Sequence, residues 1–311
     1  GNAFDIAQIP DSNYFNSVTG TVTELSTGRK FTLRDTIVLN KDVNGLFYAP
    51  EQKLYYFDNT HITSTNTTGA PLDEASKFRL DLNINNGLFS VTGETELITG
   101  LSSNISGQTQ PYKFVDNQDQ FKSTTITVNQ SGTGNHLAHR LNTTVEINIE
   151  EFQGATATPK KFMWNLGDSE TSSTTVVFTA PGSTFYELMK SNCTNNSAIT
   201  KRRLISMNTI ITGGSEVLNR YIASTKPTSG LAQSKPVYTN LEASDGHPVV
   251  GIFSARNTIR IDKVFYDPTA SGFVRCLDKI STSKLCQGSV TGPLLFCSQH
   301  TADSAEPWFC P

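Results

Sequence analysis

The chain has little charge. Only 17% of its 311 residues are Asp, Glu, Lys or Arg, and the formal net charge is −3, whereas an average globular domain is about one quarter charged. A balance so near zero argues against a protein that binds nucleic acid through a basic surface. Long apolar runs are also missing: no stretch reaches eighteen apolar residues, so the sequence predicts no membrane-spanning helix.

Catalytic motifs are equally scarce. The sequence contains no Gly-x-Ser-x-Gly elbow, phosphate-binding loop, His-Glu-x-x-His or dinucleotide-binding glycine pattern. Glu150 and Glu151 are adjacent, but neighbours on a strand point to opposite faces and cannot act together on one substrate. We interpret them as solvated charges at a strand edge, and Asp168-Ser169-Glu170 as a turn. We therefore expect no enzyme activity and no cofactor.

A metal site has only one candidate motif. His136 and His139 are three residues apart and would share a face if they lay on a helix. Gly132 and Gly134 indicate a loop instead, and no third ligand is evident. We interpret both histidines as exposed polar residues and predict no metal.

Strand-forming segments dominate what is present. The chain is rich in Ser, Thr and Asn, which compete for backbone hydrogen bonds and disfavour long helices. Residues 18–38 read as a hairpin, residues 77–84 and 144–150 alternate apolar with polar, and Asn86-Gly87 is a strong hairpin turn. The pattern predicts a mainly β protein with an immunoglobulin-like β-sandwich over residues 1–105 and a second β domain over residues 106–311.

The second domain is expected to carry two or three short helices. Residues 183–190 begin with a serine suited to capping, and residues 215–222 follow Gly213-Gly214 with a similar serine. Residues 273–285 are a third candidate, and residues 249–261 are expected to form a strand.

Four of the five cysteines lie near the end of the sequence: Cys276, Cys286, Cys297 and Cys310. They lack the spacing of a zinc site, and their clustering predicts one or two disulfides that staple a tail in an oxidising compartment. Buried free thiols are the alternative. Three pairings of these four are open, and Cys193 is left over.

Aromatic residues are the best candidates for ligand contact. Tyr55, Phe57, Trp164 and Trp308 could stack against a sugar or a peptide. Tyr55 and Phe57 share one side of a strand, and Tyr56 takes the other. Ordinary sheet packing is the alternative for all of them.

Three segments carry a resemblance to a known family: residues 213–222 (Gly-Gly-Ser-Glu-Val-Leu-Asn-Arg-Tyr-Ile), 236–240 (Pro-Val-Tyr-Thr-Asn) and 251–256 (Gly-Ile-Phe-Ser-Ala-Arg). They resemble Bacteroidetes surface lipoproteins grouped as a domain of unknown function (number 4249). Residues 89–97 fit the same family more loosely. The resemblance implies a signal peptide, a lipidated cysteine that this sequence lacks, and an anchor in the outer membrane. It supplies no catalytic or binding residue.

Together these observations predict a non-catalytic cell-surface lipoprotein of the outer membrane. The resemblance implies a TonB-dependent outer-membrane transporter as partner, and the aromatic residues suggest a glycan or peptide ligand. Two other functions stay open at this stage. One is a secreted hydrolase of glycans or peptides, and the other is an adhesin or structural surface protein.

Overall fold

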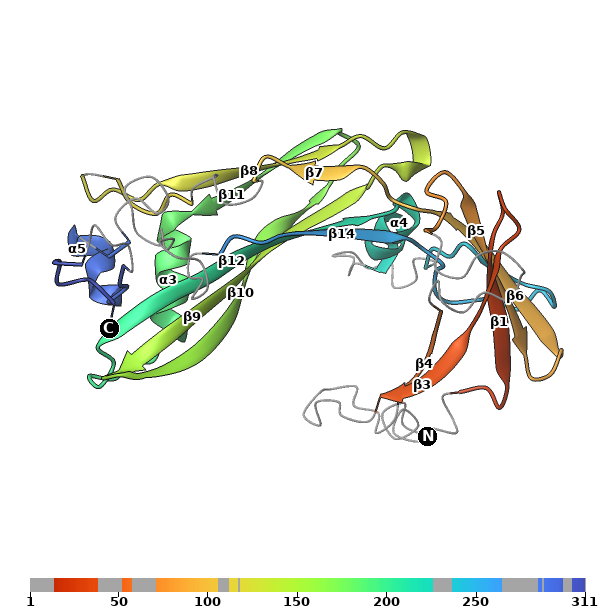
Figure 1. Cartoon of the computed structure of the whole chain (residues 1–311). Helices are drawn as coiled ribbons and strands as arrows, with labels where there is room; N and C mark the ends of the chain where they lie inside the picture. Colours follow the sequence, from red (N-terminus) through yellow and green to blue (C-terminus); the bar gives the residue numbers. More distant parts are fainter. Residues whose placement is uncertain are drawn as a thin grey trace, which may run out of the picture. The chain divides into compact units, whose positions relative to one another are not determined.

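The structure is a computed structural model and is mainly β (Figure 1). It describes residues 14–38, 52–57, 71–105, 112–116, 118–225, 237–264, 285–286, 288–298 and 304–310. Within these ranges no helix is both long and apolar enough to cross a membrane.

The chain divides into two compact units, each built from separated segments. Unit 1 comprises residues 1–98, 134–136 and 214–256, and unit 2 comprises residues 99–133, 137–213 and 257–311. The sequence-based division placed one boundary at residue 105. In the structure the segment 214–256, which follows most of unit 2 in the sequence, belongs to unit 1.

Unit 1 is organised around a five-stranded antiparallel sheet of order β13-β6-β5-β1-β2. The described residues of unit 1 also form a separate two-stranded ribbon, a 3₁₀ turn and a helix. The bounds are β1 Val18–Glu24, β2 Lys30–Thr32, β3 Arg34–Val38, β4 Gln52–Tyr56, β5 Lys77–Ile84, β6 Phe89–Glu96, β13 Leu241–Ala243, η1 Gly134–His136 and α4 Glu216–Thr225.

The turns of unit 1 follow from its sequence. Asn85, Asn86 and Gly87 all take positive φ, at 48°, 57° and 95°, which Asn and Gly tolerate best and which reverses the chain between β5 and β6. Gly28, at φ 72°, does the same between β1 and β2. The predicted hairpins at these two places are confirmed.

The core of unit 1 forms on one face of this sheet. Val22, Phe31 and Phe78 are at most 2% exposed. Val22 lies opposite Phe31 on the neighbouring strand, so both point to the same side. Burial of each such side chain contributes roughly 1.5–3 kcal/mol. The half-buried hydrophobic residues packed against this cluster are Leu33, Phe57, Leu72, Leu80, Leu97 and Phe253.

Unit 2 contains two further antiparallel sheets of long strands. A four-stranded sheet has the order β10-β9-β12-β14, and a three-stranded sheet has the order β11-β8-β7 (Figure 1). The bounds are β7 Leu101–Ser103, β8 Ser123–Gln130, β9 Arg140–Gln153, β10 Thr156–Glu170, β11 Thr175–Pro181, β12 Lys201–Gly214, β14 Arg256–Ile261, α3 Gly182–Asn192, α5 Gly288–Thr291 and η2 Gly292–Leu294.

The core of unit 2 is aromatic. Phe185 of α3 is fully buried, and its ring lies 4.1 Å from that of Phe114 and 5.9 Å from that of Trp164 on β10. The odd-numbered residues Val145, Ile147 and Ile149 of β9 are at most 1% exposed. The alternation of apolar and polar residues over 144–150 predicted that these three side chains share one face of β9.

Two helices confirm the sequence prediction. Ser215 caps α4, because its hydroxyl accepts a hydrogen bond from the Leu218 amide at 3.4 Å. The predicted cap of α3 was wrong: the helix begins at Gly182 after Pro181, and Ser183 lies inside it. The predicted strand 249–261 is limited to 256–261. The predicted helix 273–285 lies almost wholly outside the described residues.

Candidate ligand-binding pocket

A pocket of about 600 Å³ lies in unit 1. This volume is in the range of small-molecule sites, about 300–1,000 Å³. Strands β1 and β5 in the middle of the sheet supply its floor residues, and the β3–β4 ribbon supplies Asp35 and Tyr55. The lining residues are Val18, Thr19, Gly20, Thr21, Thr32, Leu33, Asp35, Tyr55, Asp81, Leu82, Asn83 and Ser90.

Gly20 allows neighbouring side chains and backbone to pack closely at the floor of the pocket. A Cβ at this position would lie 2.7 Å from the carbonyl oxygen of Asp81 and 2.7 Å from Cδ2 of Leu82, which is closer than real Cβ atoms approach. The same Cβ would lie 3.1 Å from Cδ1 of Leu33, and the Leu33 amide donates a 2.9 Å hydrogen bond to the Gly20 carbonyl. Only glycine therefore allows the two leucines to take these places beside the pocket.

The ribbon positions Tyr55. Asp35 and Tyr55 face each other across β3 and β4, so their side chains share a side of the ribbon. Phe57 follows on the same side and packs its ring 5.2 Å from that of Phe31 in the core. This contact ties the ribbon to the sheet. Tyr56 points to the other side and is 43% exposed.

The carboxylates of the pocket are already paired. Lys53 Nζ lies 3.1 Å from Asp35 Oδ2, and the hydrogen bond to Asp35 raises the pKa of Lys53. The same Nζ lies 5.5 Å from the centre of the Tyr55 ring, a cation–π distance. Arg79 Nε lies 3.0 Å from Asp81 Oδ2. No lysine or arginine is among the described residues that line the pocket.

The hydroxyl oxygen of Tyr55 is buried. It lies beside Lys53, whose pKa is raised first by the hydrogen bond to Asp35 and also by the interaction with Tyr55. Lys53 therefore joins Asp35 and Tyr55 on one side of the ribbon.

The other predicted ligand-contacting residues lie elsewhere. Trp164 is 4% exposed and packs against Phe185, which corrects its assignment as an exposed stacking platform: β10 turns it into the core of unit 2. Phe57 is likewise used in packing. Trp308 is half-buried in unit 2, where its carbonyl accepts a 2.8 Å hydrogen bond from the Ser298 amide. Tyr55 alone of the four lines the pocket of unit 1.

Both adjacent glutamates of β9 are ion-paired. Glu151 is buried and not solvated, which corrects the sequence interpretation for that residue, whereas the Glu150 side chain is 24% exposed. They do point to opposite faces: Glu151 accepts a hydrogen bond from Arg202 Nε at 3.0 Å, and Glu150 accepts one from Arg203 Nε at 3.0 Å. The Glu151 side chain is 2% exposed. Burial raises its pKa, but hydrogen bonds from Thr194 and Arg202 outweigh this and lower the pKa to about 2.

A third glutamate of β9 links the whole four-stranded sheet. Glu146 accepts hydrogen bonds from Arg260 on β14 at 2.8 Å and from Asn208 on β12 at 3.1 Å, and it pairs with Lys161 on β10 at 2.6 Å. Hydrogen bonds from Arg260 and Lys161 hold the pKa of Glu146 well below its usual range. These carboxylates stay ionised and join strands, so they are poorly suited to carry protons in a reaction.

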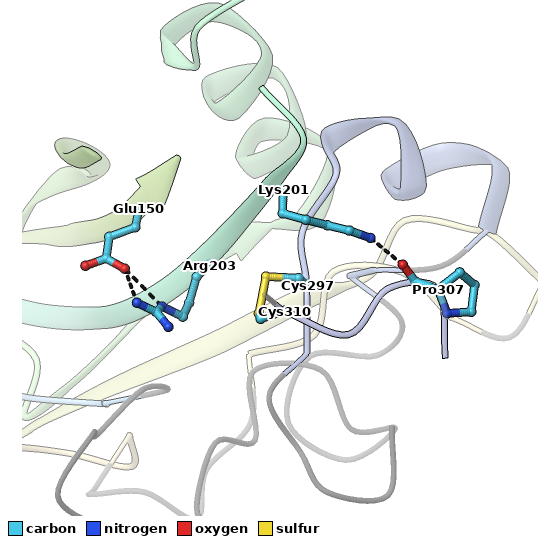
Figure 2. Close-up of a disulfide and its surroundings, with 6 residues drawn as sticks. All are labelled: Glu150, Lys201, Arg203, Cys297, Pro307 and Cys310. Carbon is cyan, nitrogen blue, oxygen red and sulfur yellow. Dashed lines mark hydrogen bonds and ion pairs between the residues drawn. A yellow bond between two sulfur atoms is a disulfide. The ribbon is translucent and has the colours of Figure 1, made fainter. Parts of the chain in front are cut away.

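A disulfide joins Cys297 to Cys310 and fastens the end of the described chain (Figure 2). Both cysteines pack on Phe152 of β9. Lys201 at the start of β12 donates a hydrogen bond to the Pro307 carbonyl beside it. This pairing selects one bond among those the sequence left open. Cys286 is buried, and Cys276 lies outside the described residues.

The two histidines do not form a metal centre in the described part of the chain. His136 lies in η1 within unit 1, with Nδ1 2.9 Å from the Leu97 carbonyl oxygen. His139 belongs to unit 2. No cluster of three or more His, Cys, Asp or Glu residues that could hold a metal occurs among the residues described.

Gly20, Asp35, Asp81 and Asn83 were not predicted as pocket residues from the sequence. Each sits in an ordinary strand or turn pattern and has no motif around it. The glycine at the centre of β1 was the one available signal, because a glycine inside a strand often marks a close approach of another group. Comparisons with protein-family models, curated proteins and solved structures find no match to this chain.

Proposed function

We propose that this protein is a non-catalytic binding module of the cell surface, which captures a glycan or peptide ligand in the pocket of unit 1. The pocket itself is the observation that carries the proposal. It contains the aromatic ring of Tyr55 and the apolar side chains of Leu33 and Leu82 beside Gly20, and aromatic and apolar side chains are the main lining of small-molecule sites.

The state of the buried acids supports a passive role. Hydrogen bonds to Arg29 lower the pKa of Glu24 to about 2, and Glu146 and Glu151 are similarly held in ion pairs. A general acid needs a pKa near the working pH, and these three groups lie far below it. A hydrolase would need a second, differently tuned carboxylate or a nucleophile with a base beside the ligand.

We further propose that the protein is lipid-anchored at the outer membrane and serves a TonB-dependent transporter. The resemblance of residues 213–256 to Bacteroidetes surface lipoproteins supports this placement. The Cys297–Cys310 disulfide supports an oxidising compartment, where such bonds persist. In the same proposal, unit 1 is an immunoglobulin-like sandwich in which the β3–β4 ribbon packs over the five-stranded sheet.

An adhesive role through strand pairing has less support. Strand β10 is the outermost strand of its sheet and is 15 residues long. However, Pro159 interrupts this strand, and Lys160 and Lys161 add charge to it. The register between β10 and β9 also shifts between Asn165 and Gly167. These are features that protect an edge against pairing with another chain.

The binding proposal is tested by screening the whole protein against glycan arrays and peptide libraries. We expect saturable binding that Tyr55→Ala abolishes and Tyr56→Ala leaves intact. Turnover of a polymeric substrate would contradict the passive role. Separately, solubilised outer membranes should yield a TonB-dependent transporter together with the protein, and its absence from the purified complex would count against the uptake role.

A further inference from the structure

We infer that two copies of this protein pair through strand β11 of unit 2 and form an antiparallel dimer. The inference goes beyond the proposed ligand binding and does not depend on it. Strand β11 is the outermost strand at one side of its three-stranded sheet: it pairs with β8, and no described strand pairs with its other side. The direction of its backbone groups, its composition and the two ends of the strand support the inference.

The free edge of β11 presents open backbone groups. The Gln130 amide donates a 2.8 Å hydrogen bond to the Thr174 carbonyl, and bonded positions alternate along an antiparallel ladder. The even-numbered residues of β11 therefore point their N–H and C=O groups to β8, whereas Val177 and Thr179 point theirs away. No described residue bonds to these groups of Val177 or Thr179. Val177 is 56% exposed and Thr179 is also exposed.

The composition of this edge favours strand pairing. Residues 175–180 read Thr-Val-Val-Phe-Thr-Ala, with no charge, and β-branched and aromatic residues are typical of strands. Proline, lysine and short length protect an edge against pairing. Strand β10 has Pro159, Lys160 and Lys161, β14 has two arginines, and β7 has only three residues. Among the described edges of unit 2, β11 is therefore the one best suited to pair with another strand.

The two ends of the strand limit what can pair with it. The Ser173 hydroxyl bonds to the amide of Thr175 at 3.2 Å and to its carbonyl at 2.9 Å, so the backbone groups of Thr175 are already used. At the other end Pro181 has no N–H. Only Val177 and Thr179 stay open, which gives an extended peptide of another protein few bonds. A second copy of β11 fits this pattern better, because its blocked positions can face these two.

A two-fold axis at Phe178 pairs all the open groups. Antiparallel pairing about this residue places Val177 opposite Thr179 of the second copy, and each such pair exchanges two hydrogen bonds. The axis generates this pair twice, so every open N–H and C=O of the two residues is satisfied in both copies. Thr175 then faces Pro181 of the second copy. An axis at Val177 would instead place Thr179 opposite the blocked Thr175.

The contact is small, so we expect a weak dimer. An interface confined to one short strand buries less than the roughly 1,000 Å² of a stable complex. A dissociation constant between about 1 µM and 1 mM fits such a contact. The dimer carries two copies of the unit 1 pocket, which would favour a ligand with repeated binding units.

The test is sedimentation equilibrium of the whole protein between about 5 µM and 1 mM, where we expect a dimer to form. Val177→Pro removes an N–H that points away from β8, so the fold should persist and the dimer should weaken at least about tenfold. Val177→Lys, which adds charge to the edge, should weaken it similarly. Val177→Thr should change it less than about twofold, because the strand stays uncharged and β-branched. Met163→Lys, at a 52% exposed position of β10, should leave it unchanged.

Cysteine variants test the register. Oxidation of a mixture of Val177→Cys and Thr179→Cys should cross-link more dimers than either variant alone, because bonded pairs bring Cα atoms to about 5.5 Å, within disulfide reach. The unaltered protein, oxidised in parallel, controls for its native cysteines. A monomer at all concentrations, or a dimer that persists in both Val177→Pro and Val177→Lys, overturns the inference. So does a dimer that Met163→Lys disrupts. Stronger cross-linking of Val177→Cys alone overturns the axis at Phe178.

Discussion

A buried ion pair closes the first hairpin of unit 1, and its removal gives the sharpest test of the structure. The Glu24 side chain is 0% exposed and that of Arg29 is 6% exposed. Arg29 donates two parallel hydrogen bonds to Glu24, Nε to Oε2 at 2.6 Å and Nη2 to Oε1 at 2.7 Å. Nη2 also donates to the Pro71 carbonyl at 2.7 Å, and Glu24 accepts from the Asp73 amide at 2.7 Å. The pair therefore holds the segment before β5 against the turn after β1.

Arg29→Met should destabilise unit 1 by about 3–5 kcal/mol at pH 7, because it leaves the Glu24 carboxylate buried without a cation. The double variant with Glu24→Gln should lose at least about 2 kcal/mol less than Arg29→Met alone, since no unpaired charge remains and the amide oxygen can still accept from Asp73. Lys77→Met is the matched control. Lys77 pairs with Glu96 at 3.4 Å, but its side chain is 56% exposed, so its loss should cost at most about 1 kcal/mol.

The same pair predicts how stability depends on pH. The pKa of Glu24 falls from 4.5 to about 2 in the folded chain, chiefly through the hydrogen bonds from Arg29. A lowered folded-state pKa stabilises the fold fully above the unfolded value and loses this contribution as the pH falls through the folded value. Unit 1 should therefore lose about 3 kcal/mol between pH 4.5 and pH 2. Arg29→Met should lack this acid-dependent loss.

The measurement is hydrogen exchange of peptides that span residues 18–32, followed in increasing urea. Both tryptophans, Trp164 and Trp308, belong to unit 2, so fluorescence reports on unit 2 and exchange is needed for unit 1. If the double variant is as unstable as Arg29→Met, or if Lys77→Met costs as much, the argument from burial is refuted.

Three further predictions concern unit 2. Opening the disulfide by Cys310→Ser should lower the free energy of unfolding by about 3 kcal/mol, because the bond closes a separation of 13 residues; urea unfolding followed by Trp fluorescence measures this, and an unchanged midpoint contradicts it. Burial raises the pKa of the free thiol of Cys193 to about 11. At pH 8 iodoacetamide should therefore modify this thiol about two orders of magnitude more slowly than an exposed cysteine. Mass spectrometry measures the rate, and a rate like that of an exposed cysteine would show that the thiol is not buried. Gly182→Ala would place a Cβ 2.1 Å from the carbonyl oxygen of Phe114 and should lower the free energy of unfolding by about 3 kcal/mol. Ser183→Ala, at the exposed neighbouring position, should lower it by less than about 1 kcal/mol. Equal urea midpoints for the two variants would refute the contact.

Local patterns predicted the elements well where the physical cause is local. The alternation in residues 77–84 corresponds to β5 without a change of bounds, because one buried face imposes a period of two on the side chains. The serine before α4 was identified as a cap because it bonds to a backbone amide only three residues away. Residues 249–255 failed as a strand, because an apolar β-branched run does not by itself provide a neighbouring strand.

The function of individual aromatic residues depended on distant partners. Trp164 and Tyr55 both lie on strands with alternating patterns, and the sequence ranked them alike. The core around Phe185 covers the first, whereas the second lies beside Gly20 and Asp81 in the pocket. No residue close in sequence to Trp164 or Tyr55 determines which face of its strand is covered by the rest of the protein.

The sequence by itself determined a β-rich chain, its hairpin turns and its two capped or short helices, since these depend on side-chain periodicity and on the backbone preferences of Asn, Gly and Ser. Only the tertiary structure decided that residues 214–256 join the first unit, that Cys297 pairs with Cys310, and that Glu146 and Glu151 of β9 are buried in ion pairs. The reason is that strand order brings together residues far apart in the chain, as when Leu241 pairs with Gly93. A repeating pattern fixes which residues share a face, but the partner across that face is set by the packing of the whole chain.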